Sequence, residues 1–271
     1  MKLVISIVYY DSGLDILSDT LRSIVDALDH ALHKRGDLEA TVVVVDNGGI
    51  LNKVKRLVGQ VVGSGSYQWM VIGTGGNIGY GAAHNLVILN QESDYHLIIN
   101  PDVEVVKDAF SEALSYMEQH PEVGMLSPYS EDPEGHKQYL CKRYPAVLDL
   151  FLRGFAPRAV KRFFVERMQE YEMRCEMNQQ ALSKEVIASG CFMFVRHSVL
   201  DKVRGFSPDF FVYFEDFDLS IRISRQSIIA YVPEVRIVHG GGNASKKGLK
   251  HIMMFAKSAF VFYHIHGWRW A

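Results

Sequence analysis

Cysteine is scarce in this 271-residue chain, which holds only Cys141, Cys175 and Cys191 and no Cys-x-x-Cys pair. Such a sparse, odd-numbered set argues against the disulfide framework of a secreted domain and against a zinc knuckle, so we expect a reducing compartment. The formal net charge is also small, at -2. A nucleic-acid binder that relies on bulk electrostatic attraction is therefore not expected.

Long hydrophobic runs are missing as well. No apolar stretch reaches the roughly 20 residues of a membrane-spanning helix, so a cytosolic or peripheral protein is expected. The apolar start at residues 3–10 is short, is followed by Asp11 and lacks a small-residue cleavage site, which favours a first strand over a signal peptide. With 48% hydrophobic residues, the chain can form one large domain or a domain with an appended lobe.

The first half of the chain alternates between strand-like and helix-like patterns. Helical spacing of apolar residues separates the strands, and Asp11 and Ser12 are candidate caps of the first helix. Strands that are apolar on both faces predict a mainly parallel sheet with helices on both sides, an α/β fold. The expected strands are residues 3–8, 41–45, 69–72 and 95–99.

Polar residues follow the ends of these strands, at Asp46, Asn77 and Asp102. Ligands of parallel α/β sheets bind beyond the carboxyl ends of the strands, so a binding site is expected there. Asn100-Pro101-Asp102 fits a metal and diphosphate site in which Asp102 holds Mg²⁺ or Mn²⁺, hard cations that prefer oxygen ligands. The alternative is a plain turn, because Asn, Pro and Asp are common turn residues.

The second half has a different character. Residues 141–180 are rich in Arg, Phe and Met, with helical stretches such as 160–177, and fit a lid, an acceptor-binding insertion or an ordinary helical excursion. Strand patterns return at 186–195, 228–233 and 235–238. The aromatic and basic stretch from Leu249 onward fits either a helix packed on the core or on a second subunit, or a contact with a membrane surface.

An acidic segment at residues 210–222 sets Glu215, Asp216 and Asp218 among aromatic residues and ends at Arg222. A buried carboxylate is costly unless it is paired, hydrogen-bonded or bound to something, so this crowding indicates a site. One of the carboxylates can act as a general base while its neighbours bind hydroxyl groups or Arg222. The alternative is a helix start whose acidic residues complement the helix dipole. Arg222 is expected to be structural.

The glycine-rich stretch at residues 73–81 matches the Thr-Gly-x-x-x-Gly-x-Gly pattern of short-chain dehydrogenases. Here it follows the third predicted strand instead of the first, and no tyrosine has a lysine four residues later. A flexible turn is the other alternative. His239, between a β-branched strand and three glycines, fits a metal ligand, a phosphate donor or a structural histidine.

Short motifs in a fixed order add up to a family resemblance. They are Ser6 to Tyr10, Val44 to Asn47, Gly75 to Gly81, Asn100 to Asp102, Ala188 to Gly190, Gly205-Phe206, the acidic segment and His239. From Val4 to about His239 the chain resembles the family-2 glycosyltransferases, in particular the rhamnosyltransferase-like branch of bacterial surface polysaccharide (O-antigen or capsule) synthesis. The resemblance implies a GT-A fold and inverting transfer of a sugar from a nucleotide donor to a saccharide or lipid-linked saccharide. It favours dTDP-rhamnose, with UDP-hexoses next.

The resemblance also implies a single glycosyltransferase domain over residues 1–271. We divide it into a nucleotide-sugar-binding half at 1–127, an acceptor and catalytic half at 128–240 and a C-terminal helical extension at 241–271. A homodimer and a peripheral membrane contact are the partners considered besides donor and acceptor.

Site residues follow from the same resemblance. Asp216 would be the catalytic base, with Glu215 as the fallback, and Asp102 and His239 would hold Mg²⁺ or Mn²⁺. Asn100 stands where the family's metal motif has its first acid, and its amide offers a neutral oxygen instead of a charge. The implied donor-binding residues are Tyr9, Asp11, Asp46, Asn77, Gly79, Gly81, Asn85, Asn100, Asp102, Ser189 and Gly190.

Two other functions stay open on the sequence. One is an NAD(P)-dependent oxidoreductase of the short-chain type, built around the glycine-rich stretch. The other is a non-catalytic nucleotide-sugar-binding subunit of a polysaccharide assembly complex. The acidic segment favours an enzyme, because a scaffold has no need to keep costly carboxylates together.

Overall fold

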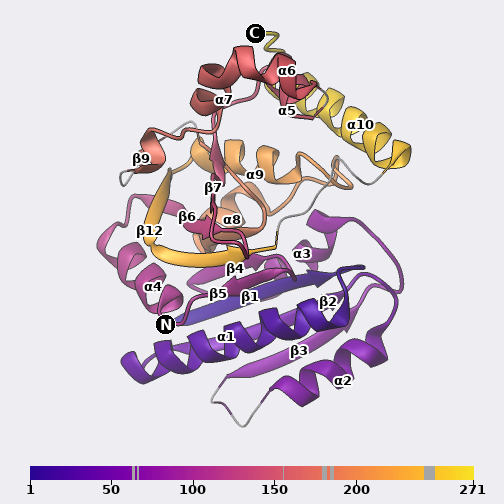
Figure 1. The fold of residues 1–271 in the computed structure, drawn as a ribbon. Coiled ribbons are helices and arrows are strands. Elements are labelled where there is room, and N and C mark those ends of the chain that lie inside the picture. The colour runs from indigo at the N-terminus through magenta and orange to yellow at the C-terminus, as the bar shows by residue number, and fades with distance from the viewer. Residues whose placement is uncertain (63–64, 66, 155, 179–181, 184–185, 241–247) are drawn as a thin grey trace.

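Helices and strands alternate along the chain (Figure 1), and the computed structural model describes residues 1–62, 65, 67–154, 156–178, 182–183, 186–240 and 248–271. The strands are β1 (Lys2–Tyr9), β2 (Glu39–Asp46), β3 (Gln68–Gly73), β4 (Tyr95–Ile99), β5 (Val103–Val105), β6 (Val123–Glu131), β7 (Lys137–Gln138), β8 (Cys141–Lys142), β9 (Leu182–Ser183), β10 (Ile187–Ala188), β11 (Phe192–Arg196) and β12 (Ile228–His239). The helices are α1 (Leu14–Lys34), α2 (Leu51–Val61), α3 (Tyr80–Ile88), α4 (Ala109–Gln119), α5 (Val147–Gly154), α6 (Arg158–Lys161), α7 (Val165–Tyr171), α8 (His197–Val203), α9 (Glu215–Ser224) and α10 (Leu249–His266), with 3₁₀ turns η1 (Arg162–Phe164) and η2 (Glu176–Asn178).

One large sheet runs through the described part of the chain. Its order is β3-β2-β1-β4-β11-β6-β12-β5, with β7 beside β6 and β9 beside β12. The pairs β3–β2, β2–β1 and β1–β4 are parallel, as the sequence predicts for the first half. β11 then runs antiparallel to both neighbours, and β12 is parallel to β6 but antiparallel to β5. The sheet is therefore mixed, with its parallel part in the first half of the chain.

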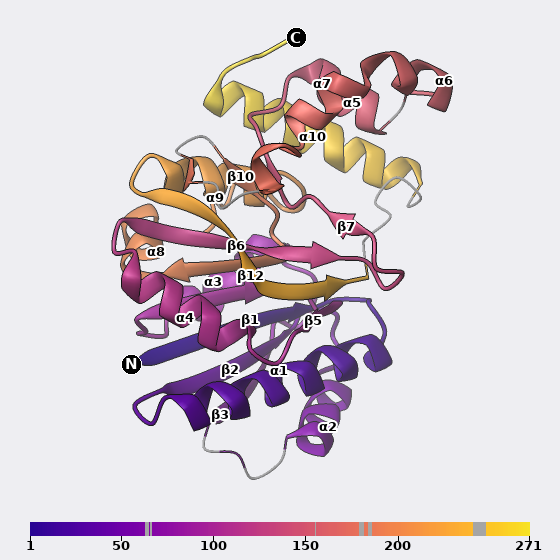
Figure 2. The ribbon, with the colours of Figure 1, turned by 60° about the vertical axis from the view of Figure 1, so that its left-hand side comes forward.

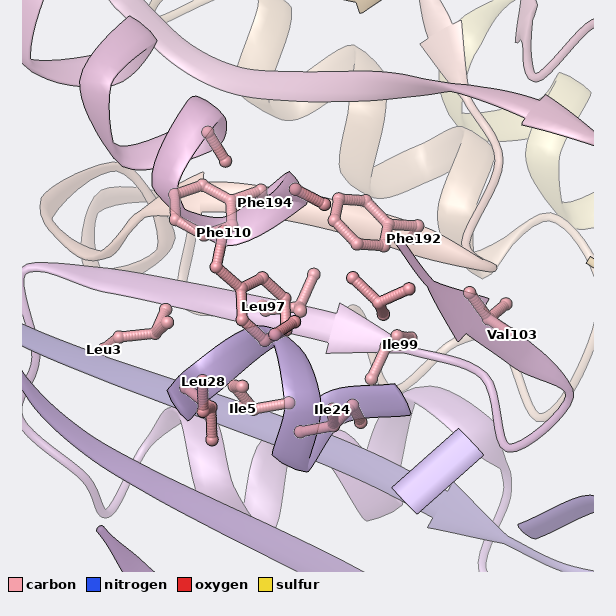
Figure 3. Close-up of a cluster of buried hydrophobic side chains, with 14 of the residues drawn as sticks. Leu3, Ile5, Ile24, Leu28, Leu97, Ile99, Val103, Phe110, Phe192 and Phe194 are labelled. Atoms are coloured by element: carbon pink, nitrogen blue, oxygen red, sulfur yellow. The ribbon is translucent and has the colours of Figure 1, made fainter. Parts of the chain in front are cut away.

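Helices cover both faces of the sheet, because side chains alternate along each strand and supply a core on either side. On β1, Leu3 and Ile5 join the core under α1 and α4, shown in Figure 3, whereas Val4 and Val8 join a core with α3. α8 and α9 continue the α3 side, where Leu200 and other apolar residues pack on β11 and β12. Figures 1 and 2 show the resulting layers.

The second half departs from the sequence expectation in several places. The expected helix at 160–177 is broken into α6, η1, α7 and η2. The strand pattern at 186–195 divides into β10 and β11, and the patterns at 228–238 form the single strand β12, whose register to β6 shifts between Val232 and Arg236. β6 is not indicated by the sequence, because Gly124 and Pro128 interrupt its apolar run.

The structure also bears on the expected caps of the first helix and on the helix expected after Leu249. Asp11 and Ser12 do not cap α1, since Gly13 is the N-cap residue and no side chain caps that end. The helix expected after Leu249 is α10, and it packs against the core through Phe262 and Tyr263.

The glycines that follow Gly240 in the sequence lie outside the described residues. In the described chain, no helix combines the length and the apolar character needed to cross a bilayer.

A buried polar cluster lies between β1, β4 and α3. Ser6 Oγ is 2.8 Å from His84 Nδ1 and 2.9 Å from His96 Nε2, and all three residues are buried. The hydroxyl has one proton, so it can donate to only one of its neighbours, which are the two rings and the Leu97 carbonyl at 3.4 Å. Burial lowers the pKa of His84 to about 3 and lowers that of His96 well below its ordinary value. Both rings are therefore neutral in the folded protein at neutral pH.

Acid should destabilise the protein through this cluster. An unfolded histidine binds a proton near pH 6.5, whereas folded His84 resists protonation down to about pH 3. Stability is therefore greatest above the unfolded pKa and falls as the pH drops below it, by about 2 kcal/mol at pH 5 for this ring alone. His84→Asn keeps a polar atom near Nδ1 but cannot be protonated. Denaturant titrations between pH 7 and pH 5 should show a flatter decline for this variant than for the wild type.

The matched control is His136→Asn, at a side chain that is 78% exposed. This control should follow the wild-type pH dependence. A decline in His84→Asn as steep as in the wild type would contradict the assignment of the acid sensitivity to this ring.

Candidate active site

A pocket of about 800 Å³ opens beyond the carboxyl ends of β1, β2 and β4. Parallel strands end at the same edge of a sheet, which brings their following loops together. The start of α9 and the end of β12 complete the walls. The sequence-predicted residues that line the pocket are Asp11, Asn77, Gly79, Asn100, Asp102, Ser189, Gly190, Glu215, Asp216 and His239.

Three predicted residues have structural positions instead. Tyr9 lies in the core on the α1 side of the sheet. Gly81 packs so closely on Phe206 that an added Cβ would lie 2.8 Å from Phe206 Cβ. The Asn85 side chain makes two hydrogen bonds to the Phe206 backbone: it donates to the Phe206 carbonyl at 2.8 Å and accepts from the Phe206 N–H at 2.9 Å. None of these three residues lines the pocket.

Asp46, the remaining predicted residue, is buried at the end of β2 behind the pocket wall. Its Oδ1 accepts the N–H of Gly48 at 3.1 Å. Its Oδ2 is buried and has no hydrogen-bond partner in the part of the chain that is described. A buried carboxylate oxygen without a partner is costly, so a ligand that donates a hydrogen bond to it would be stabilised.

Sequence reasoning missed four residues of the site. Asn47 ties the glycine-rich loop to β2, donating to Asn77 Oδ1 at 3.1 Å and accepting the Ile78 N–H at 2.9 Å. Tyr80 places its hydroxyl 2.9 Å from Asn100 Oδ1. His251 lines the pocket from α10, and Lys142 of β8 is buried next to the acidic residues. Asn47 follows a strand end and was detectable by that signal, whereas the others depend on tertiary packing.

Glu215, which is buried, and Asp216, which is half-buried, form a pair of carboxyl groups on the pocket wall. Burial, followed by the charge of Asp216, raises the pKa of Glu215 to about 8. Burial also raises the pKa of Asp216, but the Gly190 N–H at 2.9 Å from Oδ2, the Lys142 charge and the Phe217 N–H oppose that shift. At neutral pH, Asp216 is therefore the better stabilised carboxylate and Glu215 holds the proton.

Close backbone packing sets the position of Asp216. A Cβ on Gly190 would lie 3.0 Å from Asp216 Cβ, so only glycine lets this backbone N–H approach the carboxylate without displacement. The Gly190 carbonyl in turn lies 2.8 Å from the Tyr80 hydroxyl. The segment 189–191, between β10 and β11, thus links the acidic pair to the loop that carries Asn100.

The backbone directly before this pair is strained. Tyr213 and Phe214 have φ values of 66° and 65°, a left-handed conformation that costs roughly 1–3 kcal/mol for each residue other than glycine. α10 holds this turn in place. Phe214 packs against Phe255 and Phe262 with ring centroids 5.0 and 5.2 Å apart, and the Tyr213 hydroxyl is 2.8 Å from His251 Nδ1. The C-terminal helix therefore fixes the turn that directs the acidic pair into the pocket.

The third carboxylate of the acidic segment has a structural role. Asp218 Oδ2 accepts from Arg222 Nε at 2.8 Å, and Asp218 Oδ1 lies 2.8 Å from His266 Nε2 at the end of α10. Burial alone would raise the pKa of Asp218, but the hydrogen bonds from His266 and Arg222 outweigh burial and lower it. Arg222 also donates to the carbonyls of Val203 and Gly205. This agrees with the expected structural role of Arg222.

Asp102 and His239 face each other on the same pocket wall, with Asp102 Oδ1 3.7 Å from His239 Nε2. Gln138 orients the ring: its Nε2 donates to the His239 carbonyl at 3.0 Å, which turns its Oε1 toward His239 Nδ1 at 3.1 Å. An amide oxygen only accepts, so Nδ1 carries the proton. Burial lowers the pKa of His239 against the pull of Asp102, and Nε2 therefore presents a lone pair to the carboxylate.

This arrangement fits a divalent cation. Asp102 Oδ1 is buried and makes no hydrogen bond to any described residue, and the neutral His239 ring presents a lone pair to it instead of a proton. A carboxylate, an imidazole nitrogen and phosphate oxygens form a donor set that suits Mn²⁺ or Mg²⁺. The bond from Gln138 to the second ring nitrogen is the kind of support that orients metal-binding histidines.

Comparison with known proteins agrees with this geometry. Residues 4–204 match the family described as Glycosyl transferase family 2. An N-acetylglucosaminyl-diphospho-decaprenol L-rhamnosyltransferase of Mycobacterium tuberculosis is 26% identical over 212 residues, which cover 72% of this chain and 68% of that protein. Rhamnosyltransferase WbbL of Escherichia coli K12 is 26% identical over 183 residues, 61% of this chain and 62% of that protein.

Solved structures support the fold. The crystal structure of S. aureus TarS 1-349 has a TM-score of 0.54 at 12% identity and covers 98% of this chain and 74% of its own. The same protein in complex with UDP also has a TM-score of 0.54, with 95% and 65% covered. At such low identity the likeness concerns the fold alone, and the family rests on the match over most of the chain. The chain belongs to glycosyl transferase family 2 and has its GT-A fold.

Proposed function

We propose that this chain is an inverting glycosyltransferase that moves rhamnose from a nucleoside-diphosphate donor to a lipid-linked saccharide in surface polysaccharide synthesis. One observation carries the proposal: a single pocket holds a pair of adjacent carboxyl groups on one wall and a carboxylate–imidazole pair suited to a cation on another. Displacement at an anomeric carbon needs a base for the incoming hydroxyl and stabilisation of the departing diphosphate. The pocket supplies residues for both.

Asp216 is the proposed base. Its carboxylate is held by the Gly190 and Phe217 N–H groups, so it stays charged and fixed before the acceptor arrives. The acceptor oxygen attacks the anomeric carbon from the face opposite the diphosphate, its proton moves to Asp216, and the bond to the diphosphate breaks. Glu215, which is protonated at neutral pH, can donate a hydrogen bond to the acceptor and orient it.

The donor is proposed to lie against the first half of the chain. Asn77 is assigned to the nucleoside, and so is Asp46, which precedes the pocket-lining Asn47 and has an unpartnered carboxylate oxygen. Asp11, Gly79 and Asn100 are assigned to the remaining donor wall, and Ser189 and Gly190 to the sugar end. Asp102 and His239 would hold Mg²⁺ or Mn²⁺ next to the diphosphate. A bound divalent cation neutralises the charge that develops on the departing phosphate.

The substrates are inferred from the relatives. Two of them are named as rhamnosyltransferases, which favours dTDP-rhamnose, and one name includes a diphospho-decaprenol, which favours a lipid-linked acceptor. TarS was crystallised with UDP, so UDP-sugars are the second donor class to test. We propose that residues 1–127 bind the donor and residues 128–240 the acceptor within one domain, on the cytoplasmic side of the membrane.

The two alternatives from the sequence lose their support. The glycine-rich loop follows β3, not the first strand as in short-chain dehydrogenases, and its Asn77 and Gly79 line a pocket shared with Asp216. A purely binding subunit would have no use for a base held by Gly190 and a strained turn. NAD⁺ is therefore expected not to bind.

Asp216→Asn should separate catalysis from binding. The amide keeps the shape of the side chain but cannot accept the acceptor's proton, so turnover should fall by about 10²–10⁴-fold. Donor-nucleotide affinity should stay within about threefold, because a change below 1 kcal/mol is expected where no contact is lost. Single-turnover assays and calorimetric titration with dTDP and UDP measure the two quantities.

Asp209→Asn, at an exposed loop position close in sequence, is the matched control and should leave turnover unchanged. An Asp216→Asn enzyme that turns over at a comparable rate would remove Asp216 as the base, and Glu215→Gln would then be the next variant.

Removal of Asp102 or His239 should abolish the effect of metal on nucleotide binding. In the wild type, Mn²⁺ should tighten dTDP or UDP binding and EDTA should reverse this, because a cation held by Asp102 and His239 would offset the negative charge of the diphosphate. Asp102→Asn and His239→Ala should bind the nucleotide equally with and without Mn²⁺, at the weaker metal-free affinity. Calorimetry measures both.

A matched control comes from the exposed turn between β6 and β7. Asp132, Glu134 and His136 lie close enough together to hold a cation, yet none lines the pocket. Asp132→Asn should therefore keep the full Mn²⁺ effect. Loss of the effect in Asp132→Asn, or its persistence in Asp102→Asn, would contradict the proposed cation site.

A further inference from the structure

α10 is apolar on two opposite sides, although one of them is exposed. Its inner side carries Phe262 and Tyr263 into the core. Its outer side carries Leu249, Met253 and Phe260, at helical spacing, with 80%, 72% and 60% of their surfaces exposed. A helix that is hydrophobic all round is normally buried, and exposed apolar patches of this kind mark surfaces that contact a partner.

The exposed apolar surface continues beyond the end of the helix. Trp268 and Trp270 stack on each other with ring centroids 5.2 Å apart, and both are exposed. Backbone hydrogen bonds from Val147 and Leu148 to the carbonyls of Arg269 and Trp270 join this tail to the start of α5. Figures 1 and 2 both place α5, α6, α7 and α10 together, at the end of the molecule away from α1 and α2. Phe151, Phe163 and Val165 add exposed apolar side chains there.

Most charges of these segments are positive, although α5 contains the buried Asp149 and α7 contains the exposed Glu166 and Glu170. Residues 151–165 contain Arg153, Arg158, Lys161 and Arg162 and no acidic residue. Residues 248–271 contain Lys250, Lys257 and Arg269, again without an acidic residue, although the whole chain has a net charge of -2. The positive charge is therefore concentrated in the segments that also expose apolar and tryptophan side chains.

We propose that this surface, formed by the outer side of α10, the tryptophan tail and the exposed apolar residues of α5 to α7, lies on the headgroup region of an anionic phospholipid bilayer. We call it the α10 surface. Apolar and tryptophan side chains with interspersed lysine and arginine match a layer that is apolar inside, polar at its boundary and negatively charged. A second protein copy would present its own positive charge to the same surface.

The α10 surface also lies beside the pocket. His251 and Met254, in the first half of α10, line the pocket, whereas Met253 and Leu249 point outward from the same turns. A saccharide attached to a membrane lipid could therefore reach Asp216 while its lipid stays in the bilayer. This inference rests on the proposed function, because it specifies how a lipid-linked acceptor is presented to that site.

Vesicle co-sedimentation tests the proposal directly, with the full chain and vesicles of equimolar phosphatidylglycerol and phosphatidylcholine. The wild type should bind these vesicles, bind pure phosphatidylcholine vesicles much more weakly, and dissociate as salt is raised. The double variant Lys250→Ala/Lys257→Ala should bind about tenfold more weakly. Met253→Glu/Phe260→Glu should bind more weakly still, because it removes apolar contacts and adds negative charge.

Leu89→Glu is the matched control, at an apolar residue that is 56% exposed at the end of α3. It should bind vesicles like the wild type, and circular dichroism should show that all variants are folded. Wild-type binding equal to that of Met253→Glu/Phe260→Glu would overturn the proposal. So would a homodimer, seen by analytical ultracentrifugation, that this variant dissociates, because a second copy would then cover the surface.

The proposed function and the proposed membrane contact can be tested independently of each other. Nucleotide binding and transfer to a water-soluble acceptor depend on the pocket alone and should be unchanged in Met253→Glu/Phe260→Glu. Transfer to a lipid-linked acceptor in vesicles should fall in that variant. Equal loss with both acceptors would contradict the α10 surface as a membrane contact and indicate damage to the pocket.

Discussion

The packing of two neighbouring carboxyl groups at the start of α9, one buried and one half-buried, is the constraint on which the rest of the site depends. Glu215 and Asp216 cannot both be charged away from water without a large cost, so their surroundings decide which one keeps its proton. Gly190, Lys142 and the Phe217 N–H favour charge on Asp216, whereas burial and Asp216 itself favour the proton on Glu215. The strained turn at Tyr213 and Phe214, and the packing of α10 on it, keep this pair in one place. The position of the proposed base is therefore a property of the second half of the chain and of α10.

Sequence reasoning was most successful where one physical rule links residue type to position. Strand periodicity predicted β1 to β4, and the rule that ligands bind beyond strand ends predicted that Asn77 and Asp102 would share a site with each other, as they do. Prediction was less successful where the same residue type can either line a binding site or support packing. The glycines and asparagines of the 73–85 segment look alike in sequence, yet Gly79 lines the pocket whereas Gly81 and Asn85 pack on Phe206.

Other parts of the site could not be read from the sequence for physical reasons. The left-handed backbone at Tyr213 and Phe214 is imposed by packing on α10, and neither residue type favours it. Lys142 is close to Asp216 only because β8 pairs with β10, two short strands with no periodic signal. β6 was missed because its Pro128 argues against a central strand, although it pairs on both sides. Long-range pairing, and not local preference, fixed these features.

The pocket draws on distant parts of the sequence, since Val8 and residues 10–12 form one wall and His251 and Met254 of α10 form another. During synthesis the chain emerges from its first strand onward. A nascent chain therefore has its parallel strands and Asp102 long before it has the helix that holds the turn before Glu215. Until α10 has been made and has folded, the chain lacks the packing that holds the turn before Glu215 and Asp216.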